Sequence, residues 1–224
     1  MSPPNPFLYP AQPHVRRHGP VGYADAESYR DWLRDEFVFR CCYCLRRERW
    51  GRLKGEFDID HLLPRTLRPD LVTDYDNLVY CCHTCNLAKG VKQLPDPHHL
   101  AYGRCVRVNN DGTISPLNEQ GEILIDELKL NKRTTIQWRR LYLDGVRLAS
   151  ACGDTEYLGA LLGLPAELPD LVALKPPGGN SRATGSRMSW HARRLRGGCA
   201  AKCRQSSSDP HAPSTSAISC SVRP

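Results

Sequence analysis

Two cysteine pairs constrain the fold of this chain more than any other feature of its sequence. Cys41 and Cys44 form the first pair and Cys82 and Cys85 the second, each with two residues between its cysteines. This spacing lets both thiolates of a pair reach one ion, and two pairs supply the four ligands of a closed tetrahedral zinc site. We therefore expect a structural Zn²⁺ that draws two distant segments of the chain together.

Neighbouring residues leave some ambiguity about the zinc ligands. Cys42 and Cys81 each sit beside a proposed ligand, so the register could shift by one residue; we interpret both as packed spares. His83 lies inside the second pair and could replace a thiolate. A role facing solvent or phosphate is favoured for it, because two matched CxxC pairs already complete a closed site.

The eleven cysteines bear on the cellular compartment. The N-terminal residues lack the apolar stretch of a secretory leader, and no segment approaches the roughly 20 apolar residues of a membrane-spanning helix. We expect a cytoplasmic protein without membrane contact. In a reducing compartment, closely paired cysteines favour metal ligation over disulfides.

The net charge of +7 is typical of nucleic-acid binding until it is located along the chain. Nine Lys and Arg residues and one acid lie in 175–224, and they more than account for the net charge. The remaining residues are nearly neutral. Global charge therefore says little about the part of the chain that we expect to fold.

Hydrophobic patterning predicts an α+β fold flanked by disordered tails. We expect four regions: a disordered arm at 1–22, a zinc-bound core at 23–95, a hairpin and helical extension at 96–174, and a basic disordered tail at 175–224. The elements expected from periodicity and turn signals are helices at 25–37, 86–90, 133–150 and 156–162, strands at 57–61 and 77–81, and a hairpin at 105–114.

Three short motifs carry a family resemblance. They are Asp60-His61-Leu62-Leu63-Pro64, then Asn77-Leu78-Val79, then Cys82-x-x-Cys85-Asn86-x-x-Lys89-Gly90. Together, over about 37–92, they resemble the HNH family of nucleases. The resemblance implies a small ββα-metal, treble-clef-like core, with the zinc knuckles around a two-stranded hairpin and a helix.

The resemblance also implies roles for individual residues. His61 would be the general base that activates water, a task suited to a neutral imidazole. Asp60 and Asn86 would hold a divalent ion, and Asn77 would orient the catalytic loop and the base. The last motif position is Asn86 rather than His, and an amide oxygen suits Mg²⁺ or Mn²⁺ better than Zn²⁺ or Ni²⁺. The implied products carry 5′-phosphate and 3′-hydroxyl ends.

Basic residues near the motifs are candidates for nucleic-acid binding. A loop between the first cysteine pair and the first strand is rich in them, and a solvated loop without a partner is an equally good interpretation. The candidates are Arg46, Arg47, Arg49, Arg52, Lys54, Arg65 and Lys89. Weaker candidates are Arg68, the basic tail, and Arg139 and Arg140, for which a solvated helix face is favoured. No motif that reads bases is present in the sequence.

Three functions are compatible with these features. The first is a metal-dependent endonuclease that hydrolyses DNA, with duplex DNA as the favoured substrate. The second is a zinc-stabilised nucleic-acid-binding module that has lost catalysis. The third is a nuclease that cuts RNA, or one that acts only inside a restriction, phage or defence assembly. The sequence does not determine the oligomeric state.

Overall fold

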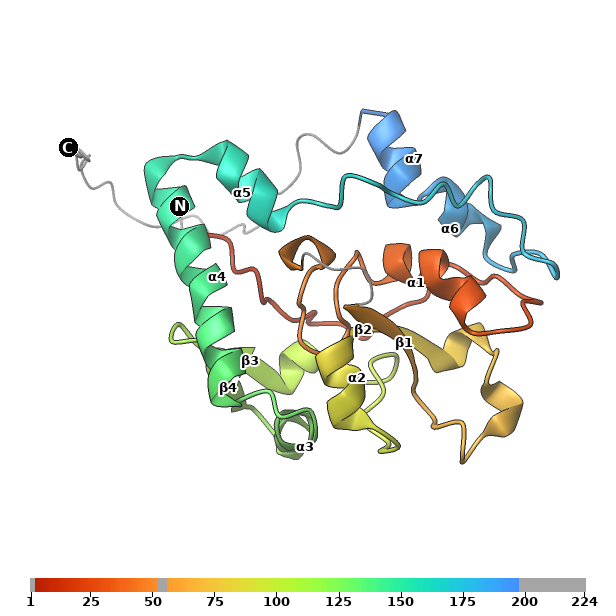
Figure 1. The fold of residues 1–224 in the computed structure, drawn as a ribbon, viewed down its shortest axis with the longest axis horizontal. Coiled ribbons are helices and arrows are strands. Elements are labelled where there is room, and N and C mark those ends of the chain that lie inside the picture. The colour runs from red at the N-terminus through yellow and green to blue at the C-terminus, as the bar shows by residue number, and fades with distance from the viewer. Residues whose placement is uncertain (1–2, 52–55, 198–224) are drawn as a thin grey trace.

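The computed structural model describes residues 3–51 and 56–197 and has the expected α+β architecture (Figure 1). Its strands form two separate two-stranded antiparallel sheets, with helices before, between and after them along the chain. In order, the elements are α1 (Arg30–Glu36), β1 (Phe57–His61), β2 (Leu78–Cys82), α2 (His83–Lys89), β3 (Val106–Val108), β4 (Ile114–Pro116), α3 (Glu119–Glu127), α4 (Arg133–Cys152), α5 (Thr155–Leu162), α6 (Ala183–Arg187) and α7 (Trp190–Leu195).

The centre of the molecule is a β1–β2 hairpin followed directly by α2. The strands pair antiparallel, from Phe57 opposite Cys82 to His61 opposite Leu78, and every residue of β2 is buried. Gly90 ends α2 with a positive φ of 54°, a conformation that glycine adopts without a steric penalty. The helix begins at His83, earlier than expected, so both its cysteine and its asparagine are helical.

Helix α1 covers the hairpin on the side opposite α2 (Figure 1). Its segment buries Tyr29, Trp32 and Leu33, residues at the helical spacing that predicted this element. The predicted helix at 25–37 is shorter in the structure: a 3₁₀ turn at Glu27–Tyr29 leads into α1. The hairpin is therefore held between two short helices.

The N-terminal segment is extended, as expected, but the prediction of a disordered arm at 1–22 is wrong for the described residues. Phe7 and Tyr9 are buried, and the Phe7 ring contacts Trp50 and Trp138, with centroids 5.2 and 5.8 Å apart. The Tyr9 hydroxyl donates a hydrogen bond of 2.8 Å to the Tyr43 carbonyl oxygen. Two buried aromatic rings anchor this segment, although it has no periodicity that a sequence pattern could reveal.

The C-terminal prediction also needs correction. Residues 175–197 of the predicted disordered tail contain α6 and α7 and pack on the core. Pro20 and Asn180 form an isolated antiparallel bridge, and the Trp190 amide donates to the Asp35 carboxylate at 2.7 Å. This segment lacks a core of its own and is ordered through polar contacts with other segments. Residues 198–224 lie outside the described residues.

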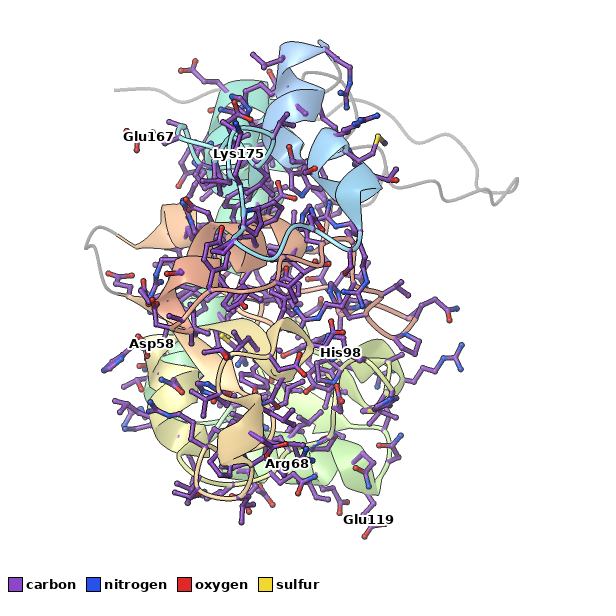
Figure 2. All side chains as sticks on the ribbon, turned by 90° about the vertical axis from the view of Figure 1, so that its right-hand side faces the viewer. Asp58, Arg68, His98, Glu119, Glu167 and Lys175 are labelled. Carbon is purple, nitrogen blue, oxygen red and sulfur yellow. The ribbon has the colours of Figure 1, made fainter. Side chains whose placement is uncertain are left out.

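The extension at 96–174 contains β3, β4 and the helices α3 to α5. In Figure 2, Glu119, at the start of α3, lies at the lower edge of the view, and Glu167, after α5, lies in its upper part. Helix α3 was not predicted, although Asn118 caps it by accepting a hydrogen bond from the Gly121 amide at 3.0 Å. In the part of the chain that the structure describes, no helix has the length and apolar character needed to cross a membrane.

Candidate functional site

The two cysteine pairs meet in one buried cluster. The sulfur atoms of Cys41, Cys44, Cys82 and Cys85 all lie within 4.8 Å of one another, and those of Cys44 and Cys82 are 3.6 Å apart. Tetrahedral zinc with Zn–S bonds of about 2.3 Å separates its sulfur ligands by roughly 3.8 Å. The cluster therefore fits the structural zinc that the sequence predicts.

The thiols of this cluster share their protons unequally. Burial raises the pKa of the Cys41 thiol, whereas hydrogen bonds from the Cys41, Cys44 and Cys85 thiols lower the pKa of Cys82. Zinc binds cysteine as the thiolate, so an ion that binds this cluster would release protons from its thiols. Cys81 is buried outside the cluster, in agreement with its interpretation as a spare.

His61 ends β1 and is held by the loop that precedes β2. Its Nε2 atom donates a hydrogen bond of 2.9 Å to the Val72 carbonyl oxygen, and within the described residues Nδ1 has no partner. Burial lowers the pKa of the imidazole, and the positive charges of Arg65 and Lys89 lower it further. The ring is therefore neutral at pH 7, with one nitrogen able to accept a proton.

Asn77 fastens the same loop to the segment that follows β1. Its Oδ1 accepts a hydrogen bond from the Leu63 amide at 2.8 Å, and its Nδ2 donates to the carbonyl oxygens of Leu63 and Leu71, each at 3.2 Å. Leu71 precedes Val72, the residue that binds His61. The side chain of Asn77 thus lies where it can orient the histidine through the loop.

Asp60 is enclosed by protein donors. Its Oδ2 accepts a hydrogen bond of 2.6 Å from the Tyr43 hydroxyl, and its Oδ1 pairs with the Lys89 ammonium at 2.9 Å. Lys89 is itself only 1% exposed and also donates to the His61 carbonyl oxygen at 2.7 Å. The expectation that Lys89 contacts nucleic acid is therefore wrong, because its ammonium group is buried and pairs with the Asp60 carboxylate.

Asn86 faces Asp58, and the described hydrogen bonds do not join it to Asp60. Asp58 Oδ2 accepts from Asn86 Nδ2 at 2.9 Å and lies 2.8 Å from Nδ1 of His83. The sequence reasoning missed Asp58 and assigned no partner to His83. Two signals were available: Asp58 and Asp60 share a face of a strand, and positions 83, 86 and 89 share a face of a helix.

The basic loop before β1 serves packing in the described structure. Arg46 pairs with Glu56, and Arg47 donates to the Leu162 carbonyl oxygen at 2.8 Å. Arg49 donates to the carbonyl oxygen of Leu164 at 3.1 Å, which ties the loop to the end of α5. Arg46, Arg47 and Arg49 thus have intramolecular partners, and their binding to phosphates stays a prediction. The remaining two candidates of this loop, Arg52 and Lys54, lie outside the described residues.

The other basic candidates differ in their exposure. Arg65 is exposed beside the His61 strand end and remains available to a ligand. Arg68 forms an exposed ion pair with Asp70 at 2.6 Å. Arg139, for which a solvated face was expected, is instead 1% exposed and donates to the Leu130 carbonyl oxygen at 2.9 Å. That interpretation of Arg139 was wrong, because a guanidinium can satisfy buried carbonyl groups.

Comparison with known proteins agrees with this geometry. Residues 41–92 match the family model described as HNH endonuclease. The match begins at the first cysteine pair, spans β1, β2 and α2, and ends just after the helix. No curated protein shows a significant match to the chain. The family match, the cysteine cluster and the ββα order of elements coincide in residues 41–92.

Proposed function

We propose that this chain is a metal-dependent endonuclease that hydrolyses phosphodiester bonds of DNA. The observation that carries the proposal is the state of His61: a neutral imidazole at the end of β1, fixed through Nε2, with Nδ1 open. Such a group can take the proton of an attacking water. The Asn77 contacts that hold the loop support the same assignment.

A divalent ion, when bound, would supply positive charge to the scissile phosphate and the departing oxygen. We propose Asp60 and Asn86 as its ligands, with Mg²⁺ or Mn²⁺ as the ion because both donors are oxygen atoms. The hydrogen bond from Asn86 Nδ2 to Asp58 leaves the Asn86 carbonyl oxygen available. Ligation by Asp60 would require the ion to share Oδ1 with the Lys89 ammonium or Oδ2 with the Tyr43 hydroxyl.

One observation favours a second candidate, a nucleic-acid-binding module without catalysis. Both oxygens of Asp60 have protein donors, which would suit a carboxylate with a structural role. The neutral His61 supports the enzyme instead, because a binding module gains nothing from an open imidazole nitrogen. An RNA substrate is a further alternative, since nothing in the described site distinguishes the two sugars.

The test is cleavage of plasmid DNA in Mg²⁺ or Mn²⁺ by the wild type and by His61→Ala. General-base catalysis contributes about 10²- to 10⁴-fold, so the variant should lose at least that lower factor while keeping its zinc. His99→Ala is the matched control, because His99 is exposed and its ion-pair partner among the described residues is Asp96. Undiminished cleavage by His61→Ala would refute the base assignment.

The substrate needs a separate comparison. Duplex DNA, single-stranded DNA and single-stranded RNA of equal length should be incubated with the wild type under the same metal conditions. We expect cleavage of DNA, with duplex DNA cut fastest, and products that carry 5′-phosphate ends. Binding without cleavage of any substrate by the wild type would favour the module, and preferential cleavage of RNA would overturn the choice of DNA.

A further inference from the structure

We propose that Arg16 and Arg182, which lie outside the HNH domain, are positioning residues of the nuclease. Both side chains contact the Asp76 segment: Arg182 binds the Asp76 carboxylate, and Arg16 binds the backbone on either side of Asn77. This segment belongs to the loop between β1 and β2, whose Val72 carbonyl oxygen accepts the hydrogen bond from His61. This inference rests on the proposed function. It assigns a task to the two segments, before and after the domain, that the sequence predicts to be disordered.

The C-terminal segment reaches the loop through a two-point contact. The Nη1 and Nη2 atoms of Arg182 donate to Oδ1 and Oδ2 of Asp76 at 3.1 and 3.0 Å. Nη1 also donates to the His18 carbonyl oxygen at 2.9 Å. A bidentate guanidinium–carboxylate pair fixes direction as well as distance, because both groups are planar. Asp76 is thereby oriented by a residue 106 positions later in the chain.

The N-terminal segment contacts the same loop through Arg16. The Arg16 side chain is 5% exposed, and its guanidinium lies 4.8 Å from the centre of the Tyr75 ring. It donates to the carbonyl oxygen of Asp76 at 3.3 Å and to that of Leu78. These two carbonyl groups flank Asn77 in the chain. Arg16 therefore restrains the backbone immediately before and after the motif asparagine.

The two segments are also joined to each other. Asn180 Oδ1 accepts a hydrogen bond from the Gly19 amide at 3.0 Å, next to the bridge between Pro20 and Asn180. Gly185 packs so closely on Arg17 that an added Cβ would lie 1.8 Å from the Arg17 carbonyl oxygen. The segments that carry Arg16 and Arg182 therefore pack against each other, and each arginine contacts the loop from a backbone that the other segment holds in place.

Hydrogen bonds within the loop connect Asn77 to His61, the proposed base. Asn77 holds Leu71 through Nδ2, and the next residue, Val72, accepts the hydrogen bond from His61. A displacement of about 1 Å in a catalytic group can cost about 100-fold in rate. Asp76 is half exposed, and an exposed ion pair adds little to global stability. Loss of Arg182 should therefore affect the rate far more than the folding of the protein.

The experiment compares full-length Arg182→Gln, Asp76→Asn and the double variant with the wild type. Asp70→Asn is the matched control, because Asp70 forms an exposed ion pair with Arg68 in the same loop without joining it to another segment. We expect Arg182→Gln to lower kcat about tenfold with KM for DNA unchanged, and the double variant to be no slower than Asp76→Asn. Asp70→Asn should retain the wild-type kcat.

A second readout does not depend on cleavage. The Asn77 amide donates to the Asp74 carbonyl oxygen at 3.0 Å, and hydrogen exchange of this amide should accelerate in Arg182→Gln but not in Asp70→Asn. Unchanged kcat with unchanged exchange would overturn the inference, as would an effect confined to KM. If the wild type cleaves no substrate, the nuclease proposal fails; exchange at Asn77 then still decides whether the two arginines hold the loop.

Discussion

Lys89 is the residue whose surroundings depart furthest from the expectation for a basic side chain. Its ammonium is buried with the Asp60 carboxylate and the His61 carbonyl oxygen as partners. A buried ion pair is costly to break from one side, because the remaining charge stays in a medium of low polarity. Lys89 therefore secures the strand end that presents His61, whatever ion binds nearby.

Replacing Lys89 by Met should destabilise the protein by about 3–5 kcal/mol, since it leaves the Asp60 carboxylate buried beside Tyr43 alone. Urea unfolding at pH 7 measures this difference. Lys92→Met is the control, because Lys92 forms an exposed ion pair with Glu127. Equal unfolding midpoints for the two variants would contradict the structural role of Lys89.

Asp58 holds Asn86, which we propose as a metal ligand, through the hydrogen bond to Nδ2, and such support of a ligand is worth about 10- to 100-fold in metal affinity. The Asp58→Ala protein should therefore need a correspondingly higher Mn²⁺ concentration for half-maximal binding in titration calorimetry. Asp70→Ala removes an exposed carboxylate at a distance and should bind like the wild type. An unaltered Mn²⁺ affinity for Asp58→Ala would contradict the role of Asp58 in supporting the metal site.

At the scale of elements, the cysteine cluster joins parts that pack weakly by themselves. The strands of the hairpin have five residues each and α2 has seven, too short to be stable alone. The Cys42 amide donates to the Tyr80 carbonyl oxygen at 2.9 Å, which places the first cysteine pair beside β2. Zinc bound to all four cysteines would hold this arrangement together.

Removing zinc should therefore unfold the hairpin and α2. Cys41→Ser and Cys85→Ser should lose bound zinc and melt at a lower temperature, and a strong chelator should do the same to the wild type. Cys152→Ser is the matched control, because that cysteine is exposed at the end of α4. Zinc content and melting that match the wild type in Cys41→Ser would disprove the four-cysteine site.

Helix α4 shows where periodicity gives an incomplete answer. The sequence predicts this helix at 133–150, but its apolar residues Leu141 and Leu148 are largely exposed. Arg139 is buried instead and donates to the carbonyl oxygens of Gly112 and Leu130. The pattern locates a helix, yet which side meets the core depends on neighbours distant in sequence.

At the scale of the whole molecule, one buried carboxylate joins three segments. Glu36 of α1 accepts hydrogen bonds from the amides of Arg17 and His18, at 2.8 and 2.9 Å, and from the Tyr75 hydroxyl at 3.1 Å. Burial opposes ionisation of Glu36, but hydrogen bonds from His14 and the Arg17 amide outweigh it and lower the pKa from 4.5 to about 2. The N-terminal segment and the loop before β2 are thus held by the same carboxylate.

This shift predicts an acid-sensitive contribution to stability. Because the folded-state pKa is lower, the contribution is fully present above pH 4.5 and is lost as the pH falls to about 2. Its size is about 3 kcal/mol. Glu36→Gln should lower the free energy of unfolding at pH 7, and the difference from the wild type should shrink between pH 4.5 and 2. Glu27→Gln, at an exposed site, should change neither value; a Glu36→Gln difference that does not vary with pH would contradict this assignment.

The sequence by itself determined the parts of this protein that depend on local spacing. The two CxxC pairs predicted the metal cluster, the alternation from Phe57 to His61 predicted β1, and Gly90 marked the end of α2. Each is set by residues a few positions apart, so ligand reach, side-chain alternation and backbone conformation are visible in the sequence.

Only the tertiary structure decided how the surrounding segments meet the domain. It paired Asp60 with Lys89, turned Asn86 toward Asp58, and brought Arg16 and Arg182 to the same loop. It also ordered segments whose composition predicts disorder. These contacts join residues up to 106 positions apart, and their energy comes from burial and geometry that exist only after the chain has folded.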